Sequence, residues 1–144
     1  MAAADDYGQP QYYLAAHADE VFLHPMGLVL LEGFGGYRRH YKEGLDKLGV
    51  EMHVFRVGEY KSAVEPYLRN DMSRETKEAL LDVYGDLWRS YVADVAAARK
   101  LAPDDVAAMA DGFTERLRAA EGDPARMAKD GRLVDRLAPR DEVR

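Results

Sequence analysis

The chain has 144 residues, and its 20 lysines and arginines against 26 aspartates and glutamates give a formal net charge of −6. This length suits one domain, and the 47% hydrophobic and 32% charged residues exclude a disordered tail or a fibre. The chain has no cysteine, which excludes disulfides, thiol catalysis and cysteine zinc sites, and the acidic balance argues against a nucleic-acid partner. The longest apolar run, Met26–Leu31, is too short for a membrane span, and the first residues show no secretion signal.

The first part of the chain predicts an α/β arrangement. Residues 1–8 are expected to be disordered. Residues 9–58 then alternate apolar runs with turn residues, and Pro25 separates the first two predicted strands. The pattern predicts helices at Gln11–Ala18 and Tyr37–Leu48, and strands at Val21–His24, Gly27–Leu31 and Val50–Val57. A glycine-rich loop, Glu32–Gly36, precedes the second helix.

The second part, residues 59–144, predicts mainly helices. Ser73 is a candidate N-cap for a long helix that reaches about Lys100, and the apolar residues from Leu80 to Val95 form a stripe along it. Two short helices and a final strand follow, at Pro103–Ala110, Pro124–Lys129 and Leu133–Val134. Three strands are few for a self-sufficient sheet, so the chain is interpreted as a single partial α/β domain with a truncated start.

The histidines and a glycine-rich loop are the first residues to consider for a binding or catalytic site. The histidines His17, His24, His40 and His53 lack metal-ligand spacing, so no metal site is predicted. The glycine loop Gly33–Gly36 could present backbone N–H groups to an oxyanion, although a tight turn that requires positive φ is the simpler explanation.

Lys61 is the candidate catalytic residue. It follows the predicted strand Val50–Val57 and Gly58, and it precedes a possible helical turn before Pro66, so it would occupy a strand-to-helix junction. Catalytic groups are common at such junctions in α/β folds. The simpler alternative is a solvated ion pair between Lys61 and Glu65, four residues later.

The segment around Lys61, HVFRVGEYKSAVEPYLRNDMS (His53–Ser73), resembles the signal peptide peptidase A family, also called the protease IV family, of the long two-repeat type. The resemblance covers most of the chain from about Gln9 onwards. It extends over four further segments, Gln9–Gly27, Tyr37–Val50, Asp86–Arg99 and Ala125–Leu137, the last of which contains a Leu-Val-Asp motif.

The resemblance implies a serine peptidase with a Ser/Lys dyad on a Clp-protease/crotonase-like fold, without a cofactor. The parent protein would be a homo-oligomer, associated with the inner membrane of the cell envelope through parts outside this soluble chain, and would cleave peptides such as residual signal peptides. Lys61 would be the general base, accepting the proton of the attacking serine. Glu65 is expected to point away from Lys61, because a paired carboxylate would favour the charged lysine.

The sequence departs from the family pattern in its serines. Ser62, Ser73 and Ser90 are its only serines, and none lies in a nucleophile elbow. The chain is therefore interpreted as the N-terminal, lysine-bearing repeat, inactive alone, whose partner is the serine-bearing C-terminal repeat.

Two alternatives remain open. The chain could be a non-catalytic helical oligomerisation or interaction module that uses the Leu80–Val95 stripe, with Lys61 as a surface residue. It could also be a crotonase-type acyl-CoA enzyme, which would need the Gly33–Gly36 loop as an oxyanion site.

Overall fold

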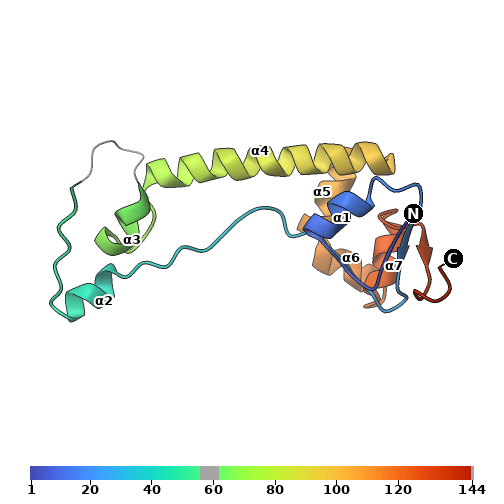
Figure 1. Cartoon of the computed structure of the whole chain (residues 1–144), viewed down its shortest axis with the longest axis horizontal. Coiled ribbons are helices and arrows are strands. Elements are labelled where there is room, and N and C mark those ends of the chain that lie inside the picture. The colour runs from blue at the N-terminus through green and yellow to red at the C-terminus, as the bar shows by residue number, and fades with distance from the viewer. Residues whose placement is uncertain (56–61, 144) are drawn as a thin grey trace. The chain divides into compact units, whose positions relative to one another are not determined.

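The computed structural model describes residues 1–55 and 62–143, and Figure 1 traces its elements in chain order. The chain divides into two compact units. Unit 1 comprises Met1–Gly33 and Trp88–Arg144, and unit 2 comprises Phe34–Leu87. The sequence predicts a single partial domain, with an α/β part up to residue 58 and a mainly helical part after it. In the structure, the chain instead leaves unit 1 after Gly33 and returns to it at Trp88.

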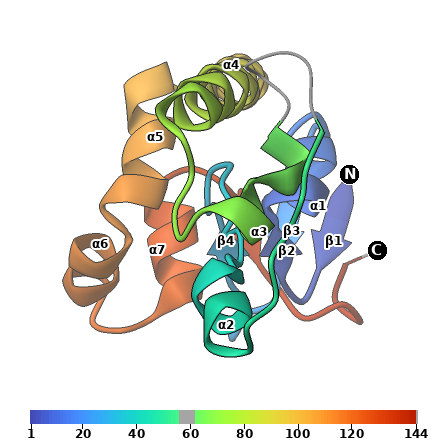
Figure 2. The same ribbon diagram turned by 90° about the vertical axis from the view of Figure 1, so that its left-hand side faces the viewer.

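Unit 1 contains short parallel strands, which confirms the predicted α/β class. Its three-stranded sheet has the order β1-β3-β5, and β2 pairs with β4 separately. The bounds are β1 Ala2–Ala4, β2 Tyr7–Gly8, β3 Val21–Leu23, β4 Val29–Leu30 and β5 Arg136–Leu137. Figure 2 shows β1 and β3 side by side.

The strands differ from the sequence predictions at both ends of the chain. Residues 1–8, which the sequence predicts to be disordered, form β1 and β2, and Tyr7 is only 4% exposed. The final strand lies at Arg136–Leu137 instead of Leu133–Val134. Such short strands carry little signal of their own, because their stability comes from hydrogen bonds to a partner distant in sequence.

Over the described residues, five helices contribute to unit 1. They are α1 Gln9–Ala15, the second half of α4 Arg74–Arg99, α5 Pro103–Asp111, α6 Phe113–Ala119 and α7 Pro124–Asp130. The predicted helices are confirmed, with small shifts at their ends, whereas the sequence does not predict α6. Prolines in the first turn of α1, α5 and α7 explain why these helices begin where they do, since a proline there removes no helical hydrogen bond. Figure 2 shows α5, α6 and α7 following one another.

The core of unit 1 forms around Tyr12 of α1 and the last turns of α4. Tyr12 and Val95 are fully buried, and Tyr91 is 6% exposed. The Tyr12 hydroxyl donates a hydrogen bond to the Leu133 carbonyl at 2.6 Å, so the core joins the two ends of the chain. Burial raises the pKa of Tyr12, which keeps the phenol protonated and able to donate.

Arg99 and Asp135 link three parts of unit 1. The guanidinium binds the carboxylate through two hydrogen bonds, of 2.7 Å and 3.0 Å, and the Arg99 side chain is 8% exposed. One Asp135 oxygen, Oδ2, also accepts the Val21 N–H at 2.7 Å, at the start of β3. Burial raises the pKa of the Asp135 carboxyl, but the hydrogen bonds and charge of Arg99 and the Val21 N–H lower the pKa more, so Asp135 is ionised.

Unit 2 contains only short helices besides the first part of α4, over the residues that the structure describes. They are α2 Lys42–Lys47, the 3-10 helix η1 Ser62–Val64 and α3 Glu65–Leu68. The predicted helix Tyr37–Leu48 is therefore too long at its start. The Tyr41 N–H donates to the Pro66 carbonyl at 2.6 Å and not to Tyr37, so helical hydrogen bonding begins later.

The predicted strand Val50–Val57 does not form over its described part. Residues 50–55 have no regular structure, and positions 56 and 57 lie outside the described residues. Met52 is 42% exposed and Phe55 is fully exposed. An alternating pattern yields a strand only beside another strand, and the described part of unit 2 contains none.

A helix that spans a membrane must be both long and apolar. None of the helices in the described part of the chain combines the length and the apolar character that a span needs.

We expect Asp135→Asn to lower the free energy of unfolding by about 1–3 kcal/mol, because the nearly buried Arg99 guanidinium loses its charged acceptor. Urea denaturation followed by circular dichroism measures this change. The control is Asp130→Asn, since the exposed Asp130 only pairs with Arg126 at 3.7 Å and its loss should change stability by less than about 0.5 kcal/mol. Equal losses in the two variants would contradict a central role for Asp135.

Candidate active site

The predicted catalytic residue, Lys61, lies outside the described residues. The structure describes the chain up to Phe55 and again from Ser62, which begins η1. The predicted strand before Lys61 is absent over its described part, whereas the predicted helical turn after it is present as η1 and α3. The candidate site is therefore built from the residues that directly follow Lys61.

The carboxylate of Glu65 is the centre of a buried polar network. Glu65 is only 2% exposed, and its Oε1 accepts hydrogen bonds from Ser73 Oγ at 2.5 Å and Thr76 Oγ1 at 2.9 Å. Its Oε2 accepts the Ser73 N–H at 3.2 Å. The carboxylate is thus bound at the start of α4. These hydrogen bonds join α3, which begins four residues after Lys61, to the start of α4.

The network also determines the charge of Glu65. Burial raises the pKa of this carboxyl, but hydrogen bonds from Ser73 and Thr76 and the positive charge of Arg69 together lower the pKa below its ordinary value. Glu65 is therefore ionised at neutral pH. A carboxylate with a lowered pKa is a weak base, so the Glu65–Ser73 contact is unsuited to activating Ser73 as a nucleophile.

Ser73 is the N-cap of α4, as predicted. Its Oγ accepts the Thr76 N–H at 3.2 Å, and the residue is only 5% exposed. A buried hydroxyl that both caps a helix and binds a carboxylate is not accessible to a peptide. Of the other serines, Ser62 lies half-buried in η1 and Ser90 is exposed on α4.

One of the backbone N–H groups that the glycine loop could offer to an oxyanion is already bound within the chain. Gly33 adopts φ +75°, which confirms the tight turn with positive φ. Its N–H donates to Gln9 Oε1 at 2.8 Å, and its carbonyl accepts Gln9 Nε2 at 3.0 Å. The Gln9 side chain therefore already accepts the first backbone N–H that an acyl-CoA enzyme would need to bind its oxyanion here. That loop also leads into irregular chain, since α2 begins only at Lys42.

The histidines form no metal site with one another or with nearby carboxylates. Within residues 1–55 and 62–143, no group of three histidine, aspartate or glutamate side chains could hold a metal ion. His17 Nδ1 lies 2.8 Å from the Tyr13 carbonyl, and His40 Nδ1 lies 2.9 Å from the Arg69 carbonyl. Both rings therefore bind backbone carbonyls of their own unit.

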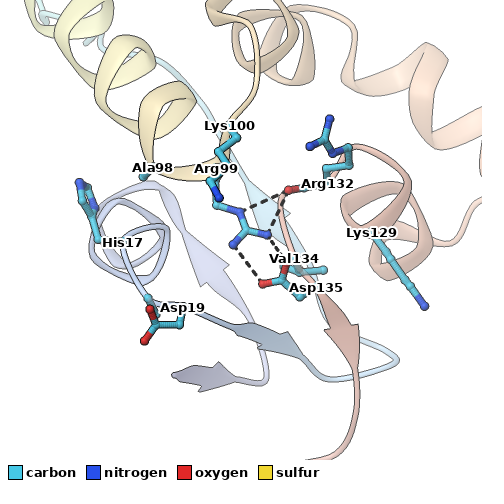
Figure 3. Close-up of a pocket in the computed structure, with 10 residues that line it drawn as sticks. His17, Asp19, Ala98, Arg99, Lys100, Lys129, Arg132, Val134 and Asp135 are labelled. Carbon is cyan, nitrogen blue, oxygen red and sulfur yellow. Dashed lines mark hydrogen bonds and ion pairs between the residues drawn. The ribbon is translucent and has the colours of Figure 1, made fainter.

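A basic cavity in unit 1 is a feature that the sequence does not predict. Its volume is about 610 Å³, and it is surrounded by the end of α4, the chain after α1 and the chain between α7 and β5. Figure 3 shows Arg99 at its centre, His17 and Asp19 on one side, and Lys129 and Arg132 on the other. Arg99 and Arg132 are 33 positions apart, which explains why no local motif reveals the site. We call this feature the basic cavity.

Comparison with known proteins gives a consistent assignment. The family model described as peptidase family S49 matches residues 1–144. "Protease 4" of Salmonella typhi is 44% identical over 143 residues, which are 99% of this chain and 23% of that protein. "Protease 4" of Haemophilus influenzae is 42% identical over 140 residues, 97% of this chain and 23% of that protein.

A third relative is less similar to the chain. "Serine protease SPPA, chloroplastic" of Arabidopsis thaliana is 28% identical over 99 residues, which are 69% of this chain and 15% of that protein. The chain thus spans about a quarter of the length of its two bacterial relatives.

We expect Ser73→Ala to lower the free energy of unfolding by about 1–3 kcal/mol, since α4 loses its cap and Glu65 loses a buried donor. Denaturation in urea, followed by circular dichroism, measures the change. Ser90→Ala is the matched control, because it makes the same substitution at an exposed position of the same helix. If Ser73→Ala is as mild as Ser90→Ala, the network does not stabilise the fold.

The lowered pKa of Glu65 predicts a pH dependence of stability. The ionised carboxylate contributes stability above its ordinary pKa of 4.5, and this contribution is lost as the pH falls through the lower pKa of the folded state. Glu65→Gln should therefore be less stable than the parent chain at pH 7, and the difference should shrink steadily below pH 4.5. Unfolding free energies measured from neutral to acidic pH test this, and a constant difference would contradict it.

Proposed function

The chain belongs to peptidase family S49, and from that premise we propose that Lys61 is the general base of a Ser/Lys dyad that hydrolyses peptides. The serine would come from a further repeat of the same protein. The single observation that carries the proposal is the family match over residues 1–144, because it includes the whole lysine-bearing segment His53–Ser73.

The proposed reaction is acyl transfer to serine followed by hydrolysis. Neutral Lys61 accepts the serine hydroxyl proton while the serine oxygen attacks the peptide carbonyl carbon. The resulting ammonium donates that proton to the departing amine, which leaves an acyl-serine. Water then attacks the ester with Lys61 again accepting a proton, and the product carboxylate and the free serine are released.

The environment of Glu65 supports this role over the simpler alternative. The alternative assigns Lys61 and Glu65 to a solvated ion pair on a helix surface. Glu65 is only 2% exposed, and both of its oxygens accept hydrogen bonds from Ser73 or Thr76. Glu65 is therefore not a solvated surface residue, and its network holds the chain that follows Lys61.

The finer parts of the proposal follow from the family. We propose a Clp-protease/crotonase-like fold for the complete protein, consistent with the short parallel strands of unit 1. Its substrates would be peptides such as cleaved signal peptides, and it would act as a homo-oligomer at the membrane of the cell envelope. Ser73 is buried, which supports a nucleophile supplied from outside these 144 residues.

A second role is favoured by the exposed apolar side chains of unit 2. No described large apolar side chain of Phe34–Leu87 is buried, and on α4 Leu81 is 72% and Val83 is 54% exposed. Exposed apolar residues in this number are typical of a surface that another protein covers. The C-terminal part of the predicted stripe, by contrast, is used internally, since Tyr91 and Val95 lie in the core of unit 1. We propose that the serine-bearing repeat covers unit 2.

One experiment separates the two roles. The purified chain is assayed on casein and fluorogenic peptides, alone and mixed with a polypeptide that carries the serine-bearing repeat, and binding is measured by analytical ultracentrifugation. We expect no hydrolysis by the chain alone and hydrolysis by the mixture. Lys61→Ala should abolish hydrolysis but keep binding, whereas Leu81→Glu should weaken both, because it places a charge in the proposed interface.

The outcomes are distinct. Hydrolysis by the chain alone that Lys61→Ala removes would mean that Ser62, Ser73 or Ser90 is the nucleophile, and the proposed origin of the serine would be wrong. Hydrolysis by the mixture that survives Lys61→Ala would exclude Lys61 as the base. Binding that survives Leu81→Glu would move the interface away from the exposed face of α4.

A further inference from the structure

The basic cavity of unit 1 concentrates positive charge in an acidic protein. Four cations line it, Arg99, Lys100, Lys129 and Arg132, against the two carboxylates of Asp19 and Asp135. The complete chain has a net charge of −6. Such a local excess of cations makes the electrostatic potential around the cavity positive.

The charges of the cavity are not equally available. Asp135 binds Arg99 through both oxygens, so this pair is internally compensated. Lys100, Lys129 and Arg132 form no ion pair with any residue that the structure describes. Asp19 offsets one of these charges, so the lining residues keep an excess of positive charge. Figure 3 shows that the Lys129 side chain extends away from Arg99, which leaves Lys100 and Arg132 as the cations that matter most.

Two of the cations lie at positions where the backbone has a positive φ. Lys100 and Arg132 adopt φ +54° and +58°, just after the ends of α4 and α7. Glycine is the usual residue at this position, because a side chain there is strained. Glycine does occupy other positive-φ positions of this chain, such as Gly49 and Gly122. Of the three non-glycine residues with positive φ in the described part of the chain, Lys100 and Arg132 line the cavity and Glu121 does not. The positive φ therefore determines where these two cations leave the backbone beside the cavity.

We propose that the basic cavity binds an oxyanion, carried either as a phosphate group or as a peptide's terminal carboxylate. Lys100 and Arg132 would supply the charge, and the Arg99–Asp135 pair would form the rigid floor between them. A volume of about 610 Å³ is within the range of small-molecule sites, so it accommodates more than a bare ion. This inference is independent of the proposed peptidase role.

The test is titration of the full chain at constant ionic strength, with binding followed through the amide NMR signals of the residues that line the cavity. The probes are inorganic phosphate, an acetylated trialanine with a free carboxylate, and the same peptide as its amide. We expect saturable binding of phosphate or of the peptide acid, with no binding of the amide. Saturation by phosphate alone identifies a phosphate site, and saturation by the acid alone identifies a carboxylate site. Saturation by neither, up to about 10 mM, would overturn the proposal.

Glycine variants separate binding from folding. Lys100→Gly and Arg132→Gly remove the cation and relieve the backbone, so each should weaken binding about three- to fivefold while the melting temperature does not fall. Arg118→Gln is the charge-matched control on α6, and Glu121→Gly is the backbone-matched control at φ +60°. Both controls should bind as the parent chain does. An equal loss in Arg118→Gln would show a non-specific charge effect and would also overturn the proposal.

Discussion

The bidentate pair of Arg99 and Asp135 is the interaction on which the order of unit 1 depends. It joins the last residue of α4 to the chain that enters β5, and through the Val21 N–H it also holds the start of β3. The strands of this unit have only two or three residues, too few to define a register by themselves. A charged contact of defined geometry at the ends of these strands therefore helps to fix the register, which strand length fixes in larger sheets.

The two units are stabilised by different physical means. Unit 1 has an apolar core, centred on fully buried Tyr12 and Val95. In unit 2 the buried side chains include Glu65, Ser73 and Thr76, which stabilise one another through directed hydrogen bonds. Such a network fixes local geometry but removes little apolar surface from water, and large apolar side chains such as Leu81 and Val83 stay exposed.

Sequence reasoning predicted the features that are local in the chain. The 3.6-residue period predicted α4, and the N-cap preference predicted Ser73, because both signals depend on residues close together in the sequence. The features that were missed depend on distant residues. Gln9 binds Gly33 across 24 positions, and Asp135 binds Val21 across 114. The predicted strand at residues 50–57 failed over its described part for the same reason, since alternation cannot reveal whether a neighbouring strand exists.

The proposed catalytic role and the exposed apolar surface of unit 2 are connected by electrostatics. Lysine has an ordinary pKa of about 10.4, so a general-base lysine needs a much lower pKa, by about 3, to be substantially neutral near pH 7. Glu65 is ionised, and both of its oxygens accept hydrogen bonds from Ser73 or Thr76. Under the proposed function, the neutral form of Lys61 would come from desolvation, which disfavours the charged lysine. No described large apolar side chain of unit 2 is fully buried, so that desolvation would come from the repeat that covers them. Under the proposed function, binding of the serine-bearing repeat would thus deliver the nucleophile and make Lys61 basic in the same step.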